Sequence, residues 1–123
     1  MTMQQTPLLM HRLMDRGAML QPDVEVLTAT ADGARSQTML ETRNRAHQLA
    51  HALNDAGIEI GDRVGTFMWN GARHLEAYHA VACMGAVIHT LNIRLSPVDL
   101  EYIINHAQDK IIIVDADILP ALE

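Results

Sequence analysis

An arginine lies between an apolar run and a capped helix in the segment 91–106, which reads LNIRLSPVDLEYIINH. The guanidinium of Arg94 stays charged and can donate paired hydrogen bonds to a phosphate or a carboxylate. Ser96 and Pro97 predict the first turn of a helix, whose free backbone N–H groups also attract anions. Many loop arginines are simply solvated, however. Residue chemistry alone therefore leaves two interpretations of Arg94, an anion contact or an exposed loop residue.

A metal site and a glycine loop are two further possibilities that the spacing does not favour. His47 and His51 are four residues apart on a predicted helix and could share a metal ion, but no third ligand follows at a convincing spacing. We interpret them as the polar flank of an amphipathic helix. Gly57, Gly61 and Gly65 precede a predicted strand, whereas phosphate loops follow one. They are expected to be a helix stop, a turn and a close-packed strand residue.

The other reactive side chains do not form a complete catalytic group. His74, His79 and His89 could exchange protons near neutral pH, but no nucleophile partner is evident. His89 lies inside a predicted strand and is expected to be a hydrogen-bonded core or wall residue. Cys83, in an apolar helix end, is expected to be inert packing. Asp115 ends a predicted strand, and a helix cap is favoured over a nucleotide contact.

Composition excludes several classes of protein. The chain has 123 residues, which suits one domain, and a net charge of −6 with scattered basic residues, which argues against nucleic-acid binding. A lone cysteine cannot form an internal disulfide, so a cytoplasmic location is predicted. The sequence contains neither a membrane-spanning apolar run nor the pattern of a secretory signal.

The elements that would position these residues follow from periodicity and capping signals. Thr38 with Glu41 predicts a capping box, and Asn70 and Ser96 predict two further helix starts. Asp32 and Gly33 predict a hairpin turn. Helices are expected near 7–19, 38–57, 70–85 and 96–106, and strands near 24–30, 35–38, 64–68, 86–91 and 110–115.

The order from residue 64 onward is strand, helix, strand, helix, strand, and these strands are apolar throughout. Such runs are typical of an α/β fold with a mostly parallel sheet and helices on both faces. Ligands of such sheets bind beyond the carboxyl ends of the strands. Trp69, Asn70, Arg94 and Asp115 are all expected at that edge. The large side chains of Met68, Trp69 and Tyr78 could line a pocket, but filling the core is favoured.

The segment WNGARHLEAYHAVACMGAVIHTLNIRLSPVDLEYIINHAQDKIIIVD resembles the early region of adenylate-forming (AMP-binding) acyl-CoA synthetases, and most closely the fatty-acid–CoA ligase branch. The resemblance covers the chain from about residue 7 to its end. It implies a two-step ligase that uses ATP, Mg²⁺ and a fatty acid to form an acyl-adenylate, which coenzyme A then converts to a thioester. It also implies that residues 1–123 are the N-terminal part of the large domain, and some members of the branch form homodimers.

The resemblance also gives expectations about activity and about Arg94. The family's Ser/Thr/Gly-rich loop ending in lysine and its catalytic lysine are not found, and Lys110, the one lysine, has no glycine loop around it. The fragment alone is therefore expected to be inactive, with no catalytic residue, no metal ligand and no tightly bound cofactor of its own. In relatives the arginine of the N-x-R-L segment can contact a phosphate of coenzyme A, which makes Arg94 the candidate contact. Many relatives have proline at the position of Ile93, which would fix the backbone before the arginine.

Two alternatives remain open from the sequence. The chain could be a non-catalytic interaction or oligomerisation module that pairs with another chain. It could also be a self-contained flavodoxin-like domain with a ligand at the edge that carries Arg94.

Overall fold

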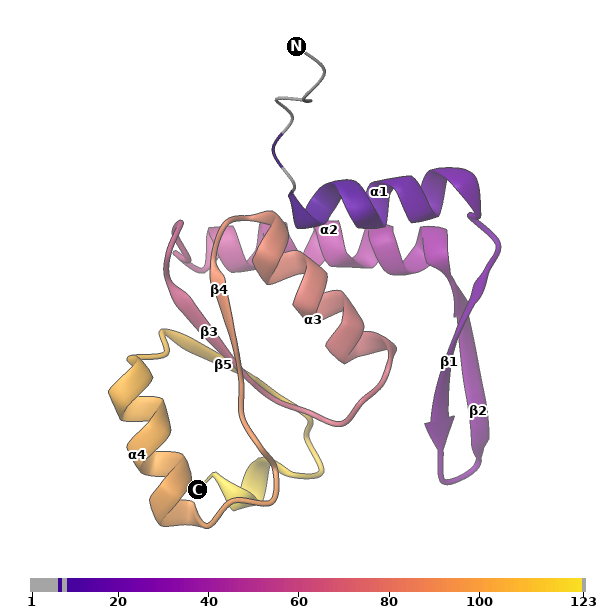
Figure 1. Cartoon of the computed structure of the whole chain (residues 1–123). Helices are drawn as coiled ribbons and strands as arrows, with labels where there is room; N and C mark the ends of the chain where they lie inside the picture. Colours follow the sequence, from indigo (N-terminus) through magenta and orange to yellow (C-terminus); the bar gives the residue numbers. More distant parts are fainter. Residues whose placement is uncertain (1–6, 8, 123) are drawn as a thin grey trace.

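A computed structural model describes residues 7 and 9–122, which form five strands, four α-helices and a short 3₁₀ turn (Figure 1). The N-terminal half contains α1 (Met10–Leu20), β1 (Glu25–Thr30), β2 (Gly33–Thr38) and α2 (Met39–Asp55). The second half contains β3 (Arg63–Phe67), α3 (Ala72–Cys83), β4 (Val87–Thr90), α4 (Pro97–Ala107), β5 (Ile111–Val114) and a short 3₁₀ turn, η1 (Leu119–Ala121). The predicted first helix begins at Met10, three residues later than expected, and its residue 8 lies outside the described residues.

The three apolar strands form a parallel sheet in the order β4-β3-β5, as their composition predicts. Gly65 of β3 lies opposite His89 of β4 on one side and Ile112 of β5 on the other. The chain therefore moves outward through α3 to β4 and then crosses β3 through α4 to reach β5.

Helices cover both faces of this sheet, which confirms the α/β prediction (Figure 1). On one face, Val64 packs with Leu53 and Val81, which come from α2 and α3. On the opposite face, Phe67 packs with Leu100 of α4 and with the loop residue Leu91. Strand side chains alternate between these two cores. None of the helices in the described part of the chain has the length and apolar character that a bilayer crossing requires.

Local side-chain caps begin two of the four described α-helices, α2 and α4. The Thr38 hydroxyl accepts from the Glu41 N–H while the Glu41 carboxylate accepts from the Thr38 N–H, so the predicted capping box is present. The predicted cap at Asn70 is wrong. The N-cap of α3 is Gly71, and the Ala72 N–H donates to the Thr28 hydroxyl at 2.9 Å. An oxygen from β1 thus satisfies this helix end, because the hairpin lies against it.

The N-terminal hairpin pairs β1 with β2 in antiparallel register, and Thr30 lies opposite Gly33 across the predicted turn. Gly33 has a φ of 129°, which a residue with a side chain rarely adopts. In Figure 1 the hairpin lies beside the start of α2, apart from the parallel sheet, and α1 lies along α2. Met14 anchors α1 against Ala46 and Ala80 of the two longer helices.

Candidate functional site

The carboxyl ends of the three parallel strands meet at one edge of the sheet, where the sequence predicts the ligand-binding residues. β3, β4 and β5 end at Phe67, Thr90 and Val114. The connection after β3 leads to α3 on one face, whereas the connection after the neighbouring β4 leads to α4 on the other. Ligands of open α/β sheets bind at such a reversal. The candidate site is therefore built around the loops 68–71 and 91–96.

The loop 91–96 presents Arg94 from a fixed backbone. The Leu91 N–H donates to the Thr66 carbonyl at 2.9 Å, and the Leu91 side chain is buried. Ile93 packs against the core formed by Phe67, Leu91 and their neighbours. Between them, the Asn92 Oδ1 accepts from the Arg94 N–H at 3.0 Å, which is an Asx-type turn. Packing and this turn thus restrict the backbone before Arg94, as the ring of a proline at position 93 would.

The Arg94 side chain is exposed, and within the described residues its guanidinium has no hydrogen bond or ion pair. Its neighbour α4 begins at the predicted cap, because the Ser96 hydroxyl accepts from the Asp99 N–H at 3.2 Å. The same hydroxyl donates to the Asp99 carboxylate at 2.6 Å. Since Asp99 already places a negative charge at this helix end, an anion near the loop would rely mainly on Arg94 rather than on the helix dipole.

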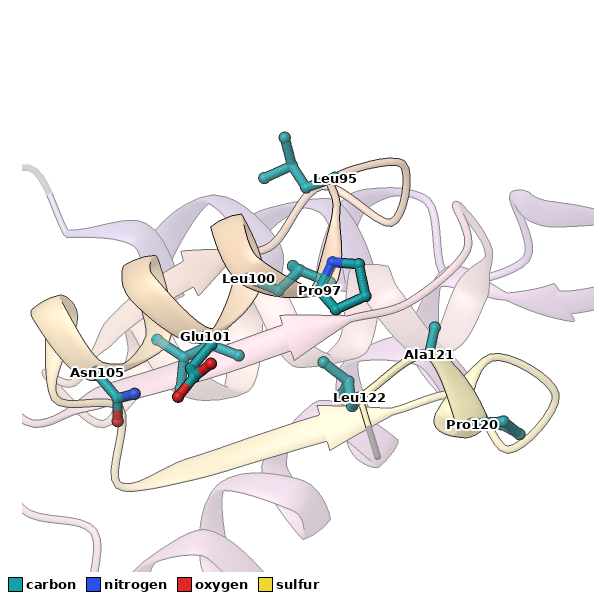
Figure 2. A pocket seen from close by; sticks show the side chains of 9 residues that line it. Leu95, Pro97, Leu100, Glu101, Asn105, Pro120, Ala121 and Leu122 are labelled. Atoms are coloured by element: carbon teal, nitrogen blue, oxygen red, sulfur yellow. The ribbon is translucent and has the colours of Figure 1, made fainter.

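A groove of about 440 Å³ runs along α4 beside this loop (Figure 2). Pro97 and Leu100 from the start of α4 face Ala121 and Leu122 near η1, and Glu101 and Asn105 continue one side along the helix. Its lining is mainly apolar. The groove therefore lies next to the loop that carries Arg94, but Arg94 itself does not line it.

Trp69 ties the ends of β3 and β5 together. The Trp69 N–H donates to the Asp115 Oδ2 at 2.8 Å, and the indole Nε1–H donates to the Asp117 Oδ2 at 2.9 Å. The predicted helix-cap role of Asp115 is therefore wrong. Trp69 is 51% exposed and Tyr78 is 43% exposed, so neither fills the core as expected, whereas Met68 is buried. Sequence reasoning missed Asp117, although two aspartates spaced by one residue after a strand were a visible signal.

His74 is a structural group and not an accessible acid or base. Its Nε2 lies 3.0 Å from the Thr66 hydroxyl, and both residues are buried. Burial lowers the pKa of His74 below its ordinary value of 6.5, and the nearby Asp115 carboxylate only partly offsets this. Burial likewise lowers the pKa of His79. Neutral His74 therefore joins the first turn of α3 to β3 beneath the loop 68–71.

His89 is the hydrogen-bonded wall residue that its strand position predicts. Its Nδ1 lies 2.7 Å from the Oδ2 of Asp109, whose side chain is fully buried. Gly65 lies beside this pair, and a Cβ there would be 3.3 Å from the same Oδ2 and 3.1 Å from the Ile112 Cγ1. Gly65 is thus a close-packed strand residue, as expected, and Gly57 and Gly61 have the positive φ angles of a helix stop and a turn.

The described residues contain no group of three potential ligands that could hold a metal ion. His47 instead lies 3.6 Å from the Asp15 carboxylate, which is bonded to Arg43, so the expectation of a polar helix flank holds. Burial raises the pKa of the Cys83 thiol above its ordinary value, and Asp15 adds to this effect. A protonated thiol is a poor nucleophile, which agrees with the prediction that Cys83 is unreactive.

The profile of the AMP-binding enzyme family matches residues 14–123. The long-chain-fatty-acid–CoA ligase of Thermus thermophilus is 42% identical over 123 residues, covering 99% of this chain and 23% of that ligase. A 3-methylmercaptopropionyl-CoA ligase of Ruegeria lacuscaerulensis is 42% identical over 115 residues, covering 93% of this chain and 21% of its own length. The solved fatty acyl CoA synthetase of Mycobacterium tuberculosis superimposes with a TM-score of 0.84 at 23% identity, covering 93% of this chain and 22% of that structure. The chain thus spans less than a quarter of the length of these proteins.

Proposed function

The chain belongs to the AMP-binding enzyme family, and we propose that residues 1–123 form the N-terminal part of the large domain of an acyl-CoA ligase. The parent protein would join a carboxylic acid to coenzyme A in two steps. ATP and the acid first give an acyl-adenylate and pyrophosphate, and the thiol of coenzyme A then displaces AMP. The observation that carries this proposal is the family match over residues 14–123, together with 42% identity to a long-chain-fatty-acid–CoA ligase.

We propose a fatty acid as the acid substrate and the cytoplasm as the location. The fatty-acid assignment is supported by the Thermus relative, whereas the equally similar Ruegeria relative is named for a short sulfur-containing acid. Acids of both kinds therefore belong in the assay. Magnesium would accompany ATP, but the described residues supply no cluster of ligands for it.

For the residues at hand, the proposed role is to contribute to the binding of coenzyme A through Arg94. Its charge is unpaired within the described residues, and it lies at the carboxyl edge of the sheet on a loop fixed by Leu91, Asn92 and Ile93. A guanidinium so placed can contact a phosphate of the nucleotide part of coenzyme A. The neighbouring negative charge of Asp99 makes this arginine the main source of affinity for an anion at that loop.

Steady-state kinetics of the parent ligase test both parts of the proposal. Thioester formation should require ATP, coenzyme A and an acid, and the 123-residue chain alone should show no acid-dependent ATP–pyrophosphate exchange. Exchange by the isolated chain would refute the expectation that it is inactive alone. A parent protein that forms no thioester with any acid tested would refute the ligase assignment.

The role of Arg94 is tested by Arg94→Ala in the parent ligase. One charge-assisted hydrogen bond on an exposed residue corresponds to about tenfold in affinity, so the KM for coenzyme A should rise by roughly that factor. Acid-dependent ATP–pyrophosphate exchange needs no coenzyme A and should be unchanged. Arg35→Ala, an exposed arginine on β2, is the matched control. An unchanged KM for coenzyme A would return Arg94 to the solvated-loop interpretation.

The family match favours the ligase over the flavodoxin-like alternative. A homo-oligomer remains part of the proposal for the parent protein. Light scattering on the purified parent distinguishes a monomer from a dimer without reference to catalysis.

A further inference from the structure

A second groove, this one lined by arginine, lies on the face of the sheet that α2 and α3 cover. It has a volume of about 410 Å³ and is bounded by α2, the first turn of α3 and the end of β5. Its polar lining comes from Arg45, Gln48, Arg73, Glu76 and Asp115. Because β3 separates β5 from β4, this groove is distinct from the loop that carries Arg94.

Arg45 is held in this groove by a buried carboxylate. Its Nε donates to the Glu76 Oε1 at 2.7 Å, and Glu76 is only 5% exposed. The same Oε1 accepts from the Gln37 Nε2 at 2.8 Å, and Gln37 also donates to the Thr42 hydroxyl. β2, α2 and α3 thus meet at Glu76. This network fixes the orientation of the guanidinium through Nε and leaves the terminal Nη groups for another partner.

Two arginines and two carboxylates line the groove, so an anion there would depend on which guanidinium groups are free of ion pairs. The negative charge of Glu76 is matched by Arg45, and the Asp115 Oδ2 accepts from the Trp69 N–H. Arg73 is exposed at the start of α3, and its guanidinium has no ion pair within the described residues. Two guanidinium groups, one of them preoriented, therefore line one concave surface.

We propose that this groove binds an oxyanion, the phosphate or carboxylate group of a small molecule, between Arg45 and Arg73. Planar guanidinium groups match the oxygens of both anions in geometry and charge. A fixed Arg45 also loses less side-chain freedom on binding than a mobile one would. The inference depends on the groove alone and would stand if Arg94 had no role with coenzyme A.

Binding is measured by titrating inorganic pyrophosphate, and separately malonate, into the ¹⁵N-labelled 123-residue chain at constant ionic strength. The arginine Nε–Hε signals of Arg45 and Arg73 should shift in a saturable way. Comparison of the two titrations identifies the preferred class of anion. Shifts of similar size in the signal of Arg35, an exposed arginine on β2, would show non-specific attraction and overturn the proposal.

Two matched pairs of variants sharpen the test. Arg73→Ala should weaken binding by at least about tenfold, since it removes a charge-assisted contact, whereas Arg35→Ala should leave binding unchanged. Arg45→Lys should weaken binding by a similar factor. Arg43→Lys is its control, because Arg43 lies on the same helix and its Nε also donates to a carboxylate, that of Asp15 at 2.8 Å. Arg43→Lys should leave binding unchanged. Asp115→Asn should tighten binding by removing a negative charge from the lining. Equal affinity of Arg73→Ala and the unmodified chain, with unchanged circular dichroism, would refute the proposal.

Discussion

Truncation of Leu100 tests how firmly α4 is attached beneath the loop that carries Arg94. Leu100 is 2% exposed and packs against Phe67 and Leu91, so Leu100→Ala removes two methyl groups and the branching carbon from a closed core. At about 0.8 kcal/mol for each buried carbon group, the transfer cost is roughly 2.4 kcal/mol. The cavity left behind raises the expected loss to about 3–4 kcal/mol in the free energy of unfolding.

Urea denaturation followed by circular dichroism measures this loss, and the same helix supplies its control. Val98 is 75% exposed, so Val98→Ala should change the free energy of unfolding by less than about 0.5 kcal/mol. If Leu100→Ala leaves too little folded protein to measure, Leu100→Met should still cost up to about 1.5 kcal/mol. Equal effects of Leu100→Ala and Val98→Ala would refute the packing of α4 on this face of the sheet.

Three further changes probe the rest of the sheet edge. Gly65→Ala would place a Cβ 3.3 Å from the buried Asp109 carboxylate and should cost about 1–3 kcal/mol of stability in the same denaturation assay. Because the pKa of buried His74 is below its ordinary value of 6.5, the unfolded state binds more protons than the folded state once the pH is below about 6.5. The free energy of unfolding should therefore decrease as the pH is lowered in that range. His74→Gln should reduce the slope of the melting temperature plotted against pH. Asp115→Ala removes the acceptor of the Trp69 N–H, so the fluorescence anisotropy of this single tryptophan should fall.

The sequence predicts the fold where the signals are local. Apolar runs that alternate with helical patterns indicate a parallel sheet, and the capping box at Thr38 needs only residues three apart. The start of α3 was predicted wrongly because its cap comes from Thr28, 44 residues earlier in the chain. A propensity for capping at Asn70 could not reveal that the hairpin would supply this oxygen.

Only part of the candidate site could likewise be predicted from the sequence. The edge position of Arg94 follows from the strand order along the sequence, but its fixed backbone depends on Ile93 packing into a core that only the folded sheet creates. The contacts of Glu76 with Gln37 and Arg45 join residues 39 and 31 positions apart. Non-local contacts of this kind leave no periodic signal, and so the second groove was not predicted.

The affinity of the proposed parent ligase for coenzyme A tests the central claim most directly, namely the proposal that the edge of the parallel strands presents Arg94 to coenzyme A. Isothermal titration calorimetry with the unmodified parent, Arg94→Ala and Arg35→Ala gives the three dissociation constants. We predict about tenfold weaker binding for Arg94→Ala and no change for Arg35→Ala. Equal dissociation constants for all three proteins would contradict the claim.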